Sequence, residues 1–403
     1  MTASKRILVL SLYYPPDLSA CSFRTVALIT ALRRQAPDAR IDVITSQPNR
    51  YRSFSSEVTE EETDGLTTIR RIRLPSHGSD LVVQAKAYAH FAWTASQLVQ
   101  GRHYDLVFAT SSRLMTAALG SWIARRLRAP LYLDIRDIFV DTLSEILPRK
   151  VSVPLKPLFS AIERWTIAGA THVNLVSQGF APHFDSRYPG RSFSYFTNGI
   201  DEAFLPERLP PMPEGRHAPA AEEPLTVVYA GNMGQGQGLH AIVPAVARQL
   251  RGRVQFKLIG DGGRREQLER ALADSGATNV RVVPPMSRDA LIAEYLAADV
   301  LFLHLNDYEA FKKVLPSKVF EYGALGKPIW AGVAGYSAQF LREEVSNVAV
   351  FPPCQADEAV RAFEQLEIRD EPRDAFIRKF GRATIMRDLA TDILRFASPG
   401  PAA

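Results

Sequence analysis

Residues 226–238 read TVVYAGNMGQGQG, a short apolar run that passes directly into a glycine-rich turn. A helical pattern over 239–250 follows at once. The β-branched residues predict a buried strand, and the glycines predict a turn in which the backbone approaches a ligand closely. A strand, a glycine turn and a helix in this order are typical of a parallel sheet with helices on its faces.

The same alternation continues on both sides of this stretch. Apolar runs predict further buried strands at 7–12, 41–45, 106–110, 131–135, 172–177, 255–259, 280–283, 300–303, 328–330 and 348–351. Helical patterns lie between them, for example over 25–34 and 115–126. We therefore predict an α/β protein with two doubly wound, Rossmann-like domains. Ligands of such domains bind at the carboxyl ends of the strands, which we expect to face a cleft between the two halves.

The alternation stops between Glu202 and Pro224, where recurring prolines exclude a long helix or a central strand. We therefore predict a first domain over 1–204, a linker over 205–224 and a second domain over 225–373. The last segment, 374–403, contains a helical pattern over 374–396, which we expect to form one long helix that returns toward the first domain.

Composition is that of an ordinary globular protein: 403 residues suffice for two domains, and 46% hydrophobic residues suffice for two cores. Cys21 and Cys354 lie far apart without metal-ligand spacing, which indicates a reducing compartment. We expect no cleaved signal and no membrane span, because no apolar run approaches about 18 residues. A net charge of +5 permits contact with anionic lipid or nucleic acid, but no basic helix with interleaved aromatics indicates nucleic acid.

The strongest local signal is FKKVLPSKVFEYGALGKP at 311–328. Pro316 suits a helix start, because its missing N–H is not needed there. Lys318 and Glu321 are three residues apart and so share one helix face. A lysine beside a glycine turn suits a diphosphate, and a glutamate suits a ribose. An ordinary surface salt bridge is the alternative for the pair, but it does not explain the Pro-Ser-Lys sequence before it.

These motifs resemble family 4 retaining glycosyltransferases, and most closely the branch that extends bacterial surface polysaccharides, including N-acetyl-fucosamine transferases. In the second half the resemblance rests on 229–238, 259–263 and 316–328. In the first half it rests on YYPP at 13–16, Arg24, DIRD at 134–137, VSQGF at 176–180 and TNGID at 197–201.

The resemblance implies a GT-B fold and transfer of a sugar from a nucleotide-sugar with its anomeric configuration retained. The donor that we expect is the UDP-sugar of an N-acetylated hexosamine or deoxyhexosamine, and no metal cofactor is expected. The acceptor implied is a polyprenyl-diphosphate-linked sugar, met at the cytoplasmic face of the inner membrane during polysaccharide assembly. Residues 80–100 are amphipathic at best, and residues 147–165 mix basic with apolar residues as interfacial helices do, although core helices fit these segments about equally well.

The resemblance also suggests residue roles. Lys318 is expected to stabilise the leaving diphosphate and Glu321 to hold the ribose. Asp134 and Asp137 are candidate catalytic carboxylates, with an internal Asp–Arg network as the equal alternative. The other expected donor-binding residues are Gly231, Asn232, Gly234, Asp261, Arg264, Met286 and Ser317. The expected acceptor-side residues are Tyr14, Arg24, Arg136, Ser177 and Asn198.

The chain departs from the family pattern mainly at charged positions. Lys313 replaces the first of two glutamates that many members carry, and Asn232 and Gln237 replace an arginine and a lysine of the glycine loop. LSACS at 18–22 replaces a Gly-Gly pair. We expect Lys318, with Lys312, Lys313 or Arg264, to supply the lost positive charge.

Two alternatives stay open: a nucleotide-sugar epimerase of the same fold, and a catalytically idle sugar-nucleotide-binding partner of another transferase. A redox Rossmann enzyme fits poorly, because the first strand leads into YYPP rather than a glycine fingerprint.

Overall fold

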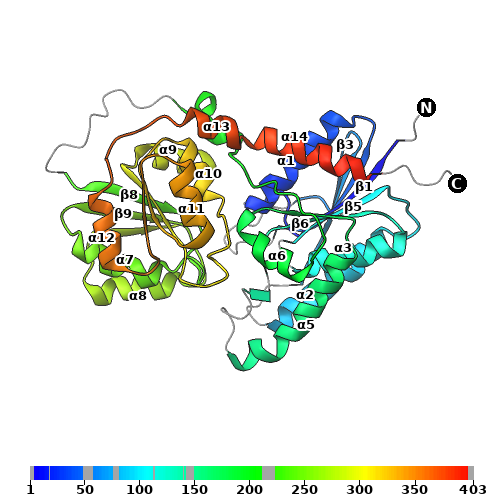
Figure 1. Ribbon diagram of the computed structural model, residues 1–403, viewed down its shortest axis with the longest axis horizontal. Helices are drawn as coiled ribbons and strands as arrows, with labels where there is room; N and C mark the ends of the chain where they lie inside the picture. The colour runs from blue at the N-terminus through cyan, green and yellow to red at the C-terminus, as the bar shows by residue number, and fades with distance from the viewer. Residues whose placement is uncertain are drawn as a thin grey trace. The chain divides into compact units, whose positions relative to one another are not determined.

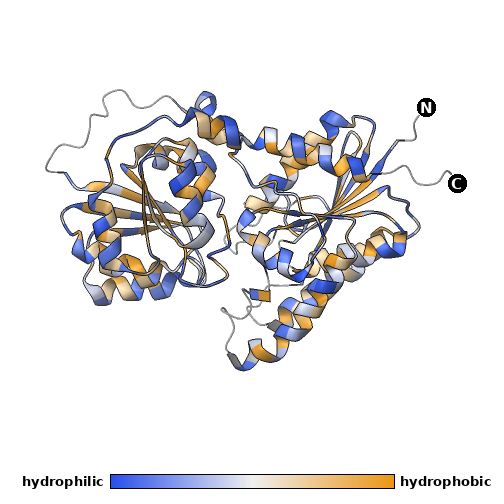
Figure 2. Ribbon diagram, viewed as in Figure 1, coloured by the Kyte–Doolittle hydropathy of each residue, from blue (hydrophilic) through white to orange (hydrophobic). Residues whose placement is uncertain are grey.

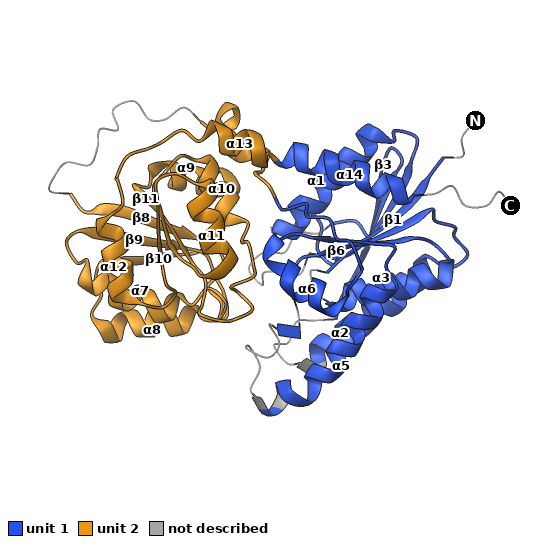
Figure 3. Ribbon diagram, viewed as in Figure 1, with its two compact units in different colours: residues 1–198, 382–403 blue, residues 199–381 orange. Residues whose placement is uncertain are grey.

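The computed structural model describes residues 4–17, 19–48, 58–75, 81–111, 114–138, 140–141, 149–210 and 223–397 (Figure 1). The chain forms two compact units, which are residues 1–198 with 382–403 (unit 1) and residues 199–381 (unit 2) (Figure 3). Unit 2 therefore begins at Gly199, within the predicted first domain, and most of the predicted linker lies outside the described residues.

Unit 1 contains a seven-stranded sheet in the order β3-β4-β2-β1-β5-β6-β7. The strands are β1 (Arg6–Leu10), β2 (Arg40–Ser46), β3 (Glu61–Asp64), β4 (Thr67–Ile72), β5 (Leu106–Thr110), β6 (Leu131–Ile135) and β7 (His172–Leu175). All neighbours are parallel except β3 and β4, which form an edge hairpin that the sequence interpretation missed. Its signal is Gly65, which has φ 59° at the first position of a two-residue loop.

Helices cover both faces of this sheet. On one face, α1 (Ala20–Gln35) and α14 (Arg382–Phe396) share an apolar cluster with alternate residues of the central strands, such as Val9 and Phe108. On the opposite face α3 (Leu114–Leu127) approaches so closely that Gly120 has no room for a Cβ against Ala109. Flanking α3 are α2 (Leu81–Leu98) and α5 (Arg149–Ala168).

Unit 2 contains a six-stranded, all-parallel sheet in the order β10-β9-β8-β11-β12-β13. The strands are β8 (Leu225–Ala230), β9 (Val254–Ile259), β10 (Val280–Val283), β11 (Val300–His304), β12 (Ile329–Gly332) and β13 (Val348–Phe351). In Figure 2 the strands of this sheet are largely in the hydrophobic colours, and β11 and β12 are buried at every position, as expected for central strands covered on both faces.

The apolar residues of β8 divide between two clusters. Val227 and Tyr229 pack with α7 (Leu239–Gln249), α8 (Arg265–Ser275) and α12 (Ala356–Glu364). Val228 and Ala230 pack with α9 (Arg288–Ala297), α10 (Lys318–Ala324), α11 (Gly335–Glu344) and α13 (Asp374–Phe380). Each unit is thus a sheet between two helical layers, all-parallel in unit 2 and parallel except for the β3–β4 edge in unit 1. This confirms the predicted pair of doubly wound α/β domains.

The C-terminal helix differs from its prediction. Instead of one helix over 374–396, α13 ends at Phe380 and α14 begins at Arg382, because Gly381 adopts the non-helical angles φ −56° and ψ 123°. Phe376 belongs to the core of unit 2, whereas Met386 and Leu389 belong to that of unit 1.

Candidate functional site

In unit 2 the strand order reverses between β8 and β11, and the predicted glycine loop 231–238 follows β8 at that point. The carboxyl ends of strands at such a reversal are where ligands bind in open α/β sheets. Gly231 has φ 144°, a backbone conformation that residues with a side chain rarely adopt. The loop therefore starts with a turn that depends on glycine.

The side chain of Lys318 lies against this turn. Its Nζ occupies the position that a Cβ on Gly231 would need, and it lies 5.3 Å from the centroid of the Tyr229 ring. The Tyr229 hydroxyl donates a hydrogen bond of 2.6 Å to the carbonyl of Asn232. An ammonium over an aromatic face is stabilised by the ring quadrupole, so Lys318 is held, as a cation, beside the loop.

Asn232 and Gln237 bind each other across the loop. The Asn232 amide donates to Gln237 Oε1 at 2.8 Å, and the backbone N–H of Gly234 donates to the same oxygen at 3.2 Å. Two neutral amides thus stand where the resemblance implied two cations. They fix the shape of the loop without adding charge to it.

The segment after β11 holds the same loop from the other side. Asn306 donates from its backbone N to Gly236 O and from its side chain to Gln235 O, each at 2.8 Å. The ring of Phe311 lies 2.8 Å from where a Cβ on Gly236 would be. Sequence reasoning missed Asn306 and gave Phe311, which opens the motif at 311–328, no role of its own. For Asn306 the available signal is the polar sequence Asn-Asp-Tyr at 306–308, shortly after a buried strand.

His304 connects the loop to the turn after β13. Its Nδ1 donates to Gln237 O at 2.7 Å, and its Nε2 accepts from the backbone N–H of Cys354 at 3.0 Å. This pair of bonds fixes a neutral tautomer. Burial lowers the pKa of His304 to about 4, so the ring stays uncharged at neutral pH.

The other predicted donor-binding residues are distributed around this loop. The carbonyl of Asp261 accepts from Met233 N at 2.8 Å, and Arg264 donates from its backbone N to Met233 O while its guanidinium pairs with Gln267. Ser317 precedes α10, and Glu321 is half-buried one turn after Lys318. Met286, after β10, packs against the apolar cluster of unit 2.

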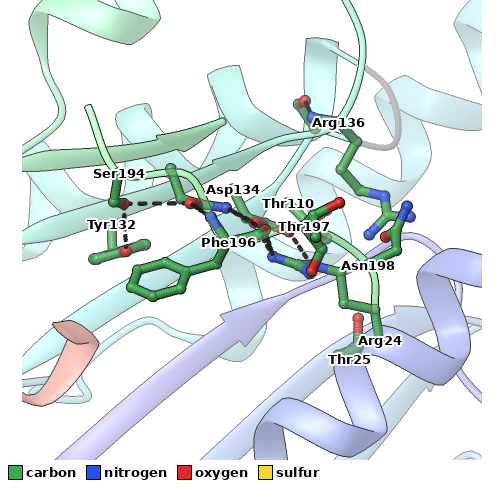
Figure 4. A network of polar contacts seen from close by, with 12 residues as sticks. Arg24, Thr25, Thr110, Tyr132, Asp134, Arg136, Ser194, Phe196, Thr197 and Asn198 are labelled. Atoms are coloured by element: carbon green, nitrogen blue, oxygen red, sulfur yellow. Dashed lines mark hydrogen bonds and ion pairs between the residues drawn. The ribbon is translucent and has the colours of Figure 1, made fainter. Parts of the chain in front are cut away.

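In unit 1, Arg24 and Asp134 form an internal ion pair (Figure 4). The guanidinium reaches both carboxylate oxygens, at 2.9 and 3.0 Å, and each side chain is only 2% exposed. Asn174 donates to Asp134 at 2.7 Å. Burial tends to raise the pKa of Asp134, but the charge and hydrogen bonds of Arg24 hold it below its usual range.

This geometry favours the internal network over a catalytic role for Asp134 and over acceptor contact by Arg24. Arg24 also donates to the backbone carbonyls of Phe196 and Thr197, so it ties α1 to the segment just before the chain enters unit 2. This preference rests on the burial of the pair in the folded sheet, which the sequence alone does not display.

Arg136 and Asn198 lie beside this network, with Thr197 next to them (Figure 4). Arg136 donates from its backbone N to Ser111 Oγ at 2.9 Å. Within the described part of the chain, Arg136 Nη1, Thr197 Oγ1 and Asn198 Oδ1 are buried without a hydrogen-bond partner. The structure therefore brings two predicted acceptor-side residues together, with hydrogen-bonding capacity to spare.

The remaining predicted residues of unit 1 lie elsewhere. Ser177 accepts from Gly179 N at 3.2 Å and caps a short helical turn. Tyr14 is buried in the α1–α14 cluster, where burial raises its pKa to about 12. Asp137 is exposed just after Arg136.

Over the described residues, no group of three or more His, Cys, Asp or Glu side chains is placed to hold a metal ion. In the same part of the chain, no helix combines the length and apolar character needed to cross a bilayer.

Both halves of the chain match known protein families. Residues 14–191 match the family described as glycosyl transferase 4-like domain, and residues 214–381 match glycosyl transferases group 1. The putative colanic acid biosynthesis glycosyl transferase WcaI of Escherichia coli K12 is 33% identical over 139 residues, which is 34% of this chain. The match spans only 33% of the length of WcaI.

Solved structures share the fold over nearly the whole chain. HepE of Anabaena, in complex with UDP and glucose, superimposes with a TM-score of 0.64 at 18% identity, covering 97% of this chain and 99% of HepE. WaaG, a glycosyltransferase of lipopolysaccharide biosynthesis, gives 0.62 at 14% identity, covering 97% of each chain. With a glycosyltransferase domain in each half and this fold throughout, the chain belongs to the glycosyltransferases of the GT-B fold.

Proposed function

We propose that the protein transfers a sugar from a UDP-sugar to a lipid-linked glycan during the assembly of a surface polysaccharide. The sugar is an N-acetylated hexosamine or deoxyhexosamine, its anomeric configuration is retained, and no metal is required. The observation that carries the proposal is the ammonium of Lys318 against the Gly231 turn at the end of β8. UDP in the HepE complex and colanic acid in the description of WcaI support the donor and the pathway class.

Sugar transfer from a nucleotide-sugar needs a cation beside the leaving diphosphate. As the glycosidic bond to the diphosphate breaks, negative charge grows on the leaving oxygen, and Lys318 would stabilise that charge. Removal of one well-placed group of this kind typically costs about 100–1000-fold in rate. Glu321, one turn further along α10, would accept hydrogen bonds from the ribose, each worth about 1.5–3 kcal/mol.

Saturation-transfer NMR against UDP, GDP and their sugars tests the donor site first. Binding of UDP and of one N-acetylated UDP-sugar is expected, and folded protein that binds no nucleotide would contradict the proposal. Lys318→Ala should then lower turnover about 100-fold or more, and Glu321→Gln should mainly weaken nucleotide binding. Lys379→Ala is the matched control, because Lys379 pairs with Glu344 on the surface of unit 2.

A binding-only role has one observation in its favour, the neutral Asn232–Gln237 pair in place of two cations. Binding does not separate that role from an enzyme, but turnover does. A protein that binds the donor, but neither transfers the sugar to a polyprenyl-diphosphate-linked acceptor nor hydrolyses the donor, would favour the idle partner.

We further propose that the protein works in the cytoplasm, attached to the inner membrane at its cytoplasmic face. The lipid-linked acceptor would be met there. Fractionation of cells should recover the protein with inner membranes at low salt and in the supernatant after a high-salt wash, whereas recovery in the supernatant at low salt would argue against attachment.

A further inference from the structure

Three of the four tryptophans of the chain are exposed, and all three lie on the outer helices of unit 1. Trp93 of α2 is 64% exposed, Trp122 of α3 is 40% exposed and Trp165 of α5 is 41% exposed. On the same helix as Trp165, Val153 and Leu158 are 62% and 55% exposed. Tryptophan is normally among the well-buried residues, so a cluster of exposed ones indicates an interaction surface.

The three tryptophans belong to one continuous face. Trp93 and Trp122 line a groove of about 450 Å³ between α2 and α3. Arg126 lies 5.4 Å from the ring of Trp122, and the neighbouring Arg125 lies 4.1 Å from the ring of Trp165. Since α3 packs against both α2 and α5, these contacts run across all three helices (Figure 1). We call this surface the tryptophan face.

The charge on the three helices has one sign. Their exposed charged residues are Lys86, Arg125, Arg126, Lys150, Lys156 and Arg164. The only acidic residue within the bounds of the three helices is Glu163, which is buried and paired with Arg187. The tryptophan face therefore combines exposed indole rings with positive charge that no acid on these helices offsets.

We propose that the tryptophan face docks on an anionic lipid bilayer. Indole rings partition to the headgroup level of a membrane, and nearby arginines and lysines are attracted to anionic lipid. A second copy of the chain is a poor occupant, because two such faces would bring like charges together. The inference deepens the proposed function and rests on it in one respect, since a lipid-linked acceptor gives the docking its purpose.

Vesicle co-sedimentation of the full-length protein tests the proposal, with phosphatidylcholine vesicles and vesicles containing phosphatidylglycerol. Binding is expected to the anionic vesicles only and to weaken in high salt. Trp93→Ser with Trp122→Ser should weaken it by about tenfold or more. Arg125→Gln with Arg126→Gln, the two cations beside the indole rings, should weaken it about fivefold per charge removed. The matched controls are Leu66→Ser, 41% exposed elsewhere in unit 1, and Arg34→Gln with Arg270→Gln. These should bind as the unmodified protein does.

Nucleotide binding and thermal melting are measured on every variant. Nucleotide binding keeps the two proposals apart, and an unchanged melting profile shows that unit 1, which carries the substitutions, is still folded. Loss of vesicle binding with unchanged melting supports the tryptophan face. A protein that binds anionic vesicles but no nucleotide keeps the tryptophan face and rejects the donor site. Equal binding to neutral vesicles, variants that bind like the controls, no vesicle binding by the unmodified protein, or a dimer abolished by the tryptophan changes would each overturn the docking proposal.

Discussion

Arg24 and Asp134 exchange two hydrogen bonds at a place that water hardly reaches, which makes the pair sensitive to the loss of either member. Removing one partner of a buried ion pair leaves an uncompensated charge and typically costs about 3–5 kcal/mol. Replacing both by apolar residues of similar size is often neutral. The main effect of the pair is therefore to fix α1 in place against the carbonyls of residues 196–197. Its net contribution to stability is smaller.

We predict that Arg24→Met lowers the free energy of unfolding of unit 1 by about 3–5 kcal/mol. The double variant Arg24→Met/Asp134→Leu should recover a large part of this loss. Urea unfolding followed by circular dichroism measures both. The control is Glu364→Gln, which breaks the half-exposed pair with Arg253 and should change stability by no more than about 1 kcal/mol. Equal losses in the single and double variants would contradict the argument.

His304 makes the stability of the folded protein depend on pH in a predictable direction. Its pKa is about 6.5 in the unfolded chain and about 4 when folded, so below pH 6.5 the unfolded chain takes up a proton that the folded protein does not. The stability due to the neutral ring is complete above pH 6.5 and is lost as the pH falls toward 4. Between pH 7 and pH 5 the loss should be about 2 kcal/mol.

The test compares the unmodified protein with His304→Gln, whose amide is polar but does not titrate. Urea unfolding at pH 7 and pH 5 should show a smaller loss in the variant. The other histidines are common to both proteins and cancel in the comparison. Identical losses would mean that His304 does not carry this dependence.

Sequence reasoning could single out Lys318 and Glu321 as candidates because a local pattern, Pro-Ser-Lys followed by Glu, contains them both. It could not identify the partners of the glycine loop, such as His304 and Asn306, because strand order brings β11 next to β8 across about 70 residues of chain. The roles of Arg24 and Asp134 stayed open for the same reason. Their burial depends on a sheet that only the folded chain contains.

At the scale of elements, the apolar strands were predictable and the edges of the fold were not. Runs such as 106–110 are buried at every position, so they stand out by composition alone. β3 was missed because Glu61–Asp64 is exposed at every position and shows no apolar alternation. The break between α13 and α14 was missed because the helical pattern continues through Gly381. The break lets α13 pack in the core of unit 2 and α14 in the core of unit 1.

The glycine turns of unit 2 give an element-scale prediction. Gly260, at the end of β9, has φ 144°, and a Cβ there would run into the carbonyl oxygen of Gly231. Gly260→Ala should therefore distort the loop that holds Lys318 and weaken UDP binding at least about tenfold, with a lower melting temperature. Gly263→Ala is the control, because a Cβ there meets nothing within 4 Å. Isothermal titration with UDP measures both, and equal affinities would refute the close packing of the two turns.

At the scale of the whole molecule, the two units differ in how the chain builds them. Unit 2 is one continuous segment, whereas unit 1 needs both ends of the chain. Met386, Leu389 and Ile393 of α14 are fully buried in the cluster that includes Leu28 and Leu32 of α1. Without α14 that apolar surface of α1 would face water.

We predict that residues 199–381 fold alone and bind UDP, while residues 1–198 alone bind a hydrophobic dye and melt without a cooperative transition. Adding a peptide of residues 382–397 should restore cooperative melting of the first fragment. Calorimetry and dye fluorescence measure these outcomes. A fragment 1–198 that melts cooperatively without the peptide would show that α14 is an accessory to unit 1.

The position of α14 also bears on synthesis of the chain. The ribosome releases residues 1–198 long before the helix that completes their core, and the intervening 199–381 stretch can fold first. At about 5–20 residues per second, translation of the remaining chain takes roughly 10–40 s. During that interval we expect α1 to expose its apolar surface to water, which would make the nascent N-terminal half a client for a ribosome-associated chaperone. The domain made first would then be the last to be finished.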